Sequence, residues 1–181
     1  YKKKIEEVYG KGSSPKSARD VHALVTMPDG QGLIRYLEIL LLPKLFLRDR
    51  ETHRQAALHM AQEVYENFNV GKIRLKFTFS RITKMKTEEV PGLKESTSEE
   101  ALLGLYEGFM DFKKQCPFFE FVLSPSFKKE EDFYNRDKFQ SKKDDFVHQV
   151  DSLLSILEKY PELRPYVTDV DTVGDDSDLY R

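Results

Sequence analysis

The sequence has one cysteine, Cys116, so an internal disulfide and a zinc site made of several cysteines are both excluded. Long apolar runs are also missing. The longest, at 37–42, contains Glu38 and ends at Pro43, whereas a membrane-spanning helix needs roughly 20 apolar residues. No basic stretch leads into an apolar one, so no secretory signal is indicated. Together these absences favour a cytoplasmic location.

An excess of either charge is lacking as well, because 29 lysines and arginines stand against 31 acidic residues, a net charge of -2. Such a balance is typical of a well-solvated surface and gives no reason to expect nucleic acid as a partner. The sequence also lacks a phosphate-binding P-loop, a dinucleotide-binding glycine motif and a serine-hydrolase motif. Its four histidines occur without the spacing of a metal site. No catalytic residue and no metal ligand is therefore predicted in this chain.

Buried-type strands alternate with amphipathic helices along the chain. The strands are predicted at 34–42, 73–79, 118–123 and 166–173. Helices are predicted at 13–27, 49–68, 96–116 and 144–160. Residues 125–143 combine many charges with scattered aromatic side chains, which predicts a long loop or an insertion. Those aromatic side chains could instead contact another subunit, so a homo-oligomer is one expectation.

This alternation predicts an α/β fold with parallel strand pairing and right-handed crossovers. About four parallel strands with intervening helices fit a partial (β/α)8 TIM-type barrel, and they fit a small doubly wound domain equally well. In both architectures, ligands bind at the carboxyl ends of the strands. The sequence begins at Tyr1 among charged residues and stops soon after a strand-like stretch. We therefore expect residues 1–181 to be an internal segment of one larger barrel domain.

The last predicted strand carries acidic residues along its length and at its exit. A period of two places Asp169 and Asp171 on one face. A buried carboxylate is costly unless it meets a cation, a metal or a hydrogen-bond donor, so these acids are candidate site residues. Gly174, which lets a ligand approach the backbone, and Asp175 follow them. The alternative is an ordinary polar loop in which Asp176 caps a helix.

Glu38 is the one carboxylate in the first predicted strand. Burying it without a partner is expensive, so a specific role is expected. Two interpretations stay open: a site residue, or a structural ion pair with Arg74 or Lys76 of the next strand.

Two strand-end motifs resemble those of the adenosine deaminase and AMP deaminase family. The segment Tyr36-Leu37-Glu38-Ile39, followed by Pro43, is similar to the family's second-strand motif. The segment Val170-Asp171-Thr172-Val173-Gly174-Asp175 is similar to its fourth-strand motif, and 73–79 lies where its third strand would. By this resemblance the chain is the central part of an amidohydrolase-type (β/α)8 barrel.

The resemblance implies a zinc-dependent hydrolase that deaminates adenosine or an adenine nucleotide. In that family, histidines and an aspartate hold the zinc ion, which activates the attacking water. Gly174 would offer its backbone N–H to the purine ring, and Asp171 would be an inward acid close to it. Glu38 and Asp175 would have structural roles. The metal ligands would lie outside 1–181, so this chain alone would be inactive.

The sequence also departs from the family. The family's arginine after its glutamate–valine pair is Leu40 here, its glycine–aspartate–glutamate is Gly174-Asp175-Asp176, and 118–141 would be an insertion. Two alternatives therefore stay open. One is a non-catalytic α/β scaffold or assembly module, and the other is a doubly wound domain that binds a phosphorylated ligand.

Overall fold

The structure is a computed structural model that describes residues 6, 10–27, 29–30, 32, 39, 46–79, 96–128 and 137–173. The chain divides into two compact units. The first comprises Tyr1–Arg48 and Val90–Lys94, and the second comprises Asp49–Glu89 and Glu95–Arg181. Within the described part of both units, none of the helices combines the length and the apolar character needed to cross a bilayer.

In the first unit, the described helix is α2 (Ala18–Val25). It begins with a capping box, in which the Ser17 hydroxyl accepts a hydrogen bond from the Asp20 N–H at 3.2 Å and the Asp20 carboxylate accepts one from the Ser17 N–H at 3.0 Å. The predicted start after Ser13 was therefore too early, because the reciprocal cap forms at Ser17.

Of the strand predicted at 34–42, the structure describes Ile39 alone, and its backbone is helical rather than extended. The strand was predicted from a short apolar run, and such a run does not by itself distinguish a buried strand from a buried helix. Glu38 lies outside the described residues, so its role stays a prediction.

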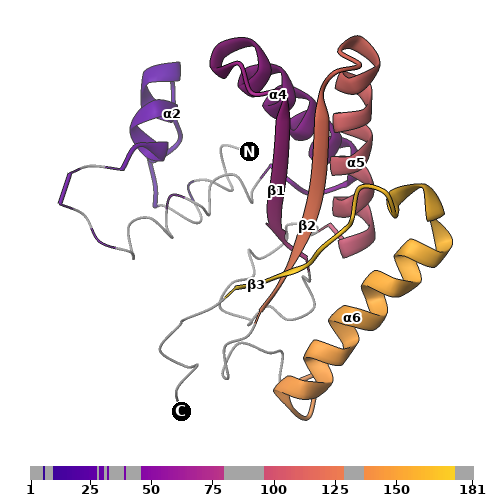
Figure 1. The fold of residues 1–181 in the computed structure, drawn as a ribbon. Helices are drawn as coiled ribbons and strands as arrows, with labels where there is room; N and C mark the ends of the chain where they lie inside the picture. The colour runs from indigo at the N-terminus through magenta and orange to yellow at the C-terminus, as the bar shows by residue number, and fades with distance from the viewer. Residues whose placement is uncertain are drawn as a thin grey trace. The chain divides into compact units, whose positions relative to one another are not determined.

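The second unit contains a three-stranded parallel sheet in the order β1-β2-β3 (Figure 1). Its strands are β1 (Lys72–Thr78), β2 (Glu120–Lys128) and β3 (Asp171–Val173). Its helices are α4 (Arg50–Phe68), α5 (Ser98–Gln115), α6 (Lys142–Lys159) and the 3-10 helix η2 (Pro161–Leu163). The chain passes from β1 through α5 to β2 and from β2 through α6 to β3, so the predicted α/β alternation with parallel pairing is confirmed for these strands.

Local capping sets where these helices begin. Helix α4 starts directly after Asp49, in agreement with the predicted bounds, because the Asp49 carboxylate accepts a hydrogen bond from the Thr52 N–H at 2.8 Å and caps the helix. Helix α5 starts after Thr97 instead of the predicted Ser96, because Thr97 and Glu100 form the reciprocal box. Helix α6 starts after Ser141, ahead of the predicted acidic start.

Strand β2 is longer than predicted and occupies the centre of the described sheet. Its pairing extends through Pro125, which lies opposite Phe77, to Ser126, which lies opposite both Thr78 and Asp171. Residues 125–128 were expected to belong to a loop or insertion because the stretch 125–143 is rich in charged residues. Instead they continue β2: Pro125 pairs with β1, Ser126 pairs with both neighbours, and Phe127 and Lys128 pair with β3. As a result β2 separates β1 from β3, the two strands that the family resemblance would treat as consecutive.

All three long helices of the second unit pack on one face of the sheet. That face presents alternate residues of β1 and β2 to a single apolar cluster. The ring centroids of Phe121 in β2 and Phe109 in α5 are 5.0 Å apart, and those of Phe127 in β2 and Phe146 in α6 are 5.6 Å apart. The buried members from the helices and strands are Ala57, Ala61, Phe79, Leu102, Leu103, Leu105, Phe109, Phe112, Phe119, Phe121, Leu123, Phe127, Leu153, Ile156 and Leu163.

Helices α4 and α5 approach each other closely because two glycines of α5 face the backbone of α4. A Cβ on Gly108 would lie 2.1 Å from the Arg54 carbonyl oxygen and 2.7 Å from the Ala57 Cβ. A Cβ on Gly104 would lie 2.3 Å from the Arg50 carbonyl oxygen. Only residues without a side chain permit this contact, so the two glycines fix the distance between the helices.

The predicted inward face of α6, formed by Phe146, Val150, Leu153, Leu154 and Leu157, is confirmed in part. Leu153 is buried and Val150 and Leu157 pack against the apolar cluster, whereas Leu154 is 53% exposed. The helix also buries Ile156 and two polar residues that were not expected, Asp145 and Gln149. Gln149 is only 1% exposed, and neither its amide oxygen nor its amide nitrogen has a hydrogen-bond partner in the structure. A buried amide of this kind destabilises the folded state.

Replacing Gly108 by alanine should lower the free energy of unfolding by about 3 kcal/mol, because the added methyl group forces α4 and α5 apart. Urea unfolding followed by circular dichroism measures this change. The matched control is Gly71→Ala, where the new Cβ meets nothing within 4 Å. Equal stability of both variants would contradict the close helix contact.

Replacing Gln149 by methionine should raise the free energy of unfolding by about 1 kcal/mol, because a side chain of similar length removes two buried polar atoms without partners. Thermal and urea unfolding both report the change. The exposed Gln140 provides the control, since Gln140→Met should leave stability nearly unchanged. A marked loss of stability in Gln149→Met would show that the amide has a stabilising role.

Candidate functional site

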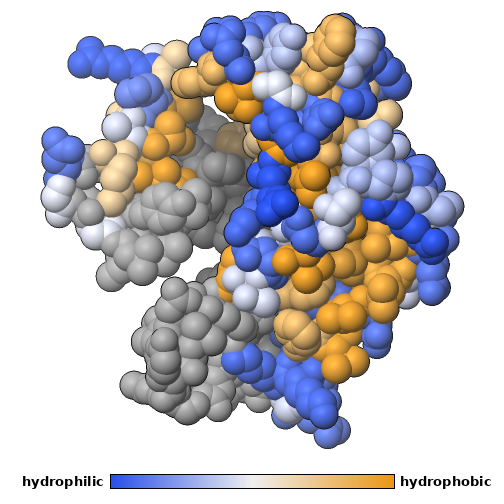
Figure 2. All heavy atoms as spheres, viewed as in Figure 1, coloured by the Kyte–Doolittle hydropathy of each residue, from blue (hydrophilic) through white to orange (hydrophobic). Residues whose placement is uncertain are grey.

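The face of the sheet opposite the helices carries polar side chains from all three strands. We call it the polar sheet face and define it by Arg74, Lys76, Ser124, Ser126, Asp169 and Asp171. The cations come from β1, the hydroxyls from β2, and the carboxylates from β3 and the residues just before it. Figure 2 shows hydrophilic side chains in a band over β1.

Direct contacts join these side chains into two sets across the sheet. The Ser124 hydroxyl donates to Asp169 Oδ1 at 2.5 Å, and Arg74 Nη2 lies 3.3 Å from Asp169 Oδ2. Two residues further along each strand, the Ser126 hydroxyl donates to Asp171 Oδ2 at 3.5 Å, and Lys76 Nζ lies 3.2 Å from the same oxygen. Each carboxylate therefore meets one cation and one hydroxyl, and the two sets are electrically balanced.

The sequence produces this face through the two-residue period of a strand. Along β1, partly buried Ile73, Leu75 and Phe77 alternate with exposed polar residues. On the central strand, Ser124 and Ser126 are only 1% and 2% exposed, because longer side chains flank them on both sides. Short hydroxyls in the middle and long charged groups at the sides give a continuous polar layer.

Of the predicted site residues, the structure describes Asp171 and places its side chain on the polar sheet face, partly exposed. Gly174, Asp175 and Glu38 lie outside the described residues, so their roles stay predictions. Asp169, which was expected to share a face with Asp171, does so. Arg74 and Lys76, the suggested partners of Glu38, pair with Asp169 and Asp171, and whether either also meets Glu38 stays a prediction.

Sequence reasoning missed Ser124 and Ser126. Their signal is present in the sequence, because Leu123, Pro125 and Phe127 alternate with them in a period of two. The many charged residues of 125–143 obscured it, because that stretch was taken as a loop. Had the alternation been followed past Pro125, the two hydroxyls would have been assigned to the face that carries the acids.

The residues of the polar sheet face do not fit a zinc site. They include no histidine, and both carboxylates are engaged by cations and hydroxyls. Across the described ranges, no group of three or more histidine, cysteine, aspartate or glutamate side chains has a geometry that could hold a metal ion. What this face offers is an array of hydrogen-bond donors and acceptors, suited to a polar ligand or to a polar interior.

Three of the four histidines make local contacts. The ring Nδ1 of His53, buried on α4, lies 2.8 Å from the Asp49 carbonyl oxygen. His22 contacts Thr26, four residues later on α2, and His148 contacts Ser152 on α6. Cys116 is a partly buried free thiol that packs against the apolar cluster.

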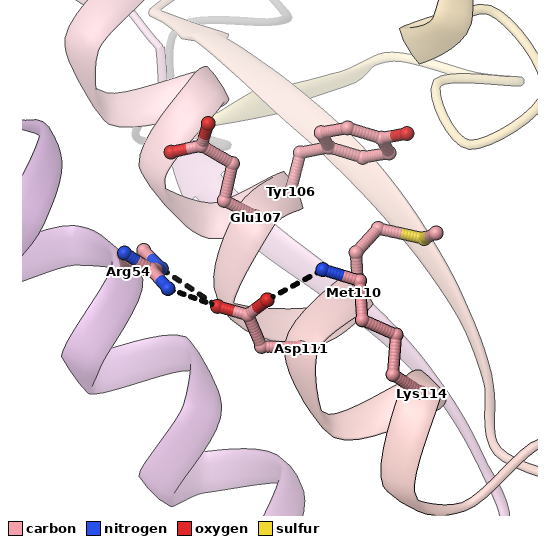
Figure 3. A pocket seen from close by; sticks show the side chains of 6 residues that line it. All are labelled: Arg54, Tyr106, Glu107, Met110, Asp111 and Lys114. Atoms are coloured by element: carbon pink, nitrogen blue, oxygen red, sulfur yellow. Dashed lines mark hydrogen bonds and ion pairs between the residues drawn. The ribbon is translucent and has the colours of Figure 1, made fainter.

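A separate depression of about 400 Å³ lies on the outer side of α5. Figure 3 shows Tyr106 and Met110 on one side of it, with Asp111 between Arg54 and Lys114. The Asp111 carboxylate lies 2.6 Å from Arg54 Nη2 and 2.9 Å from Lys114 Nζ, and Glu107 accepts a hydrogen bond from Arg50 Nε at 2.8 Å. Its four charged side chains are thus all paired, which makes the depression part of the α4–α5 contact.

These ion pairs shift the pKa values of the groups involved. The Arg50 guanidinium holds the pKa of Glu107 below its usual value, and Lys114 followed by Arg54 does the same for the pKa of Asp111. Burial raises the pKa of Tyr106. At the other end of α5, hydrogen bonds from Lys159 and Tyr160 lower the pKa of Glu99. The carboxyl groups of Glu99, Glu107 and Asp111 are therefore ionised at neutral pH, and their ion pairs support the packing of the helices.

Comparison of the chain with protein-family models gives no match, and comparison with curated protein sequences gives none either.

The contact between Ser124 and Asp169 should appear as a coupling energy of about 1 kcal/mol in a double-mutant cycle built from Ser124→Ala and Asp169→Ala. Urea unfolding of the four proteins measures it. The control cycle pairs Ser124→Ala with Asp171→Ala, whose side chains share no hydrogen bond, so its coupling should be near zero. Additive effects in the first cycle would argue against the contact.

Proposed function

We propose that this chain is the central part of a zinc-dependent purine deaminase-like hydrolase, in which the polar sheet face lines the interior of a (β/α)8 barrel. The substrate would be adenosine or an adenine nucleotide. The main support is the arrangement of the parallel sheet, whose helices all pack on one face while Asp171 lies on the other. A barrel wall also has its helices outside and the other face of its strands turned to the interior, although bulky apolar residues usually fill that interior where this chain has polar ones.

The two strand-end motifs add the proposed chemistry. Asp171 belongs to the second motif, and Gly174 follows it at the carboxyl end of the strand, where barrels bind their ligands. In the proposed enzyme, the Asp171 carboxylate accepts a hydrogen bond from the substrate, or it orients another side chain that contacts the substrate. Lys76 and Ser126 hold the carboxylate in place. Zinc, by the resemblance, would be held by residues outside this chain and would supply the activated water.

A non-catalytic scaffold is the second candidate, and one observation favours it. Asp169 and Asp171 each already meet a cation and a hydroxyl, so the described part of the face is satisfied without a ligand. Residues whose partners all belong to the same sheet need no substrate to explain them. In this interpretation the polar sheet face stabilises a larger assembly.

Ammonia release from adenosine and from AMP by the full-length protein that contains this chain tests the proposal. We expect release by the wild-type protein and a loss of about tenfold or more in kcat/KM for Asp171→Asn, which keeps the size of the side chain but removes its charge. Asp151→Asn, at an exposed position of α6, is the matched control and should leave the activity unchanged. A full-length protein that binds no transition metal and releases no ammonia from either substrate would favour the scaffold.

A further inference from the structure

Helix α6 presents apolar side chains to solvent on the side that does not face the sheet. Val147 is 46% exposed and Leu154 is 53% exposed. The residues that α6 buries, Asp145, Gln149, Leu153 and Ile156, lie on a different side of the helix. Figure 2 shows hydrophobic side chains gathered over α6. Exposed apolar residues at helical spacing are costly in water, so this surface is suited to a partner.

Four residues lie along nearly one line on this side of α6, because they are spaced at steps of four, seven and four. They are Lys143, Val147, Leu154 and Glu158. The two central residues are apolar, and the two end residues have opposite charges. Both end residues are exposed, and neither takes part in any ion pair among the described residues.

This order is self-complementary when the helix is reversed. If two copies of α6 lie antiparallel about a two-fold axis near the middle of the helix, Val147 of one protomer meets Leu154 of its partner. The same operation brings Lys143 of one protomer to Glu158 of its partner, and symmetry forms each contact twice. Charge complementarity of this kind also fixes the orientation of the pair.

We propose that the Val147–Leu154 face of α6 binds a second copy of this chain as an antiparallel, two-fold symmetric helix pair. The inference goes beyond the proposed function and does not depend on it. A contact between two helices of this length lies at the small end of interface sizes, which is typical of weak, concentration-dependent dimers. The partially covered Val150 and Leu157 border the contact.

Sedimentation velocity of the full-length protein that contains this chain, over a wide concentration range, tests the dimer. We expect a monomer at low concentration and a dimer at high concentration. Leu154→Glu should abolish the dimer or weaken it at least tenfold, because it places a carboxylate in the apolar centre of the contact. Phe118→Glu is the matched control, since Phe118 is 88% exposed but lies outside α6, and it should leave the dissociation constant unchanged.

A charge exchange provides the specific signature. Lys143→Glu alone and Glu158→Lys alone should each weaken the dimer about fivefold, because every symmetric contact then joins like charges. The double variant should restore the dimer to within about twofold of the original. Circular dichroism and thermal unfolding check that these exposed changes leave the fold intact. A chain that stays monomeric at every concentration, or a dimer that survives Leu154→Glu, would overturn the proposal.

Discussion

The alternation of side chains along two parallel strands is the constraint on which the second unit depends. Because successive residues of β1 and β2 point to opposite faces, Phe121, Leu123 and Phe127 enter the apolar cluster while Ser124 and Ser126 face away from it. A shift of one residue in the pairing would exchange the two faces. The register Phe77–Pro125 and Ser126–Asp171 therefore fixes both the core and the polar sheet face at once.

The two faces are stabilised in different ways. On the apolar face, glycines at 104 and 108 let α4 and α5 approach, and the ion pairs Arg50–Glu107 and Arg54–Asp111 flank that contact. On the polar face, burial of a carboxylate is offset by a neighbouring cation and a hydroxyl donor. The fold thus tolerates charged groups on a sheet because each one has a partner on the adjacent strand.

Features set by local interactions could be predicted from the sequence, and features set by distant contacts could not. The start of α4 and the alternation in β1 depend on neighbouring residues, and both predictions are confirmed. The extension of β2 past Pro125 depends on pairing with strands on both sides, which outweighs the local effect of a proline. The full buried side of α6 depends on how the helix docks on β2, so hydrophobicity predicted Leu153 but not the buried Asp145 and Gln149. Asp171 was predicted for the candidate site, but Lys76 and Ser126 as its partners follow only from the register.

The central claim is that the polar sheet face lines the interior of a larger protein and faces a purine ligand. An experimental structure of the full-length protein with a bound purine nucleoside analogue tests it most directly, through the distance between the purine ring and the Asp171 carboxylate. We predict that further strands continue the sheet and that the ring lies within hydrogen-bonding reach of the carboxyl end of β3. A second layer of helices packed over Arg74 and Lys76, with the ligand bound elsewhere, would contradict this account.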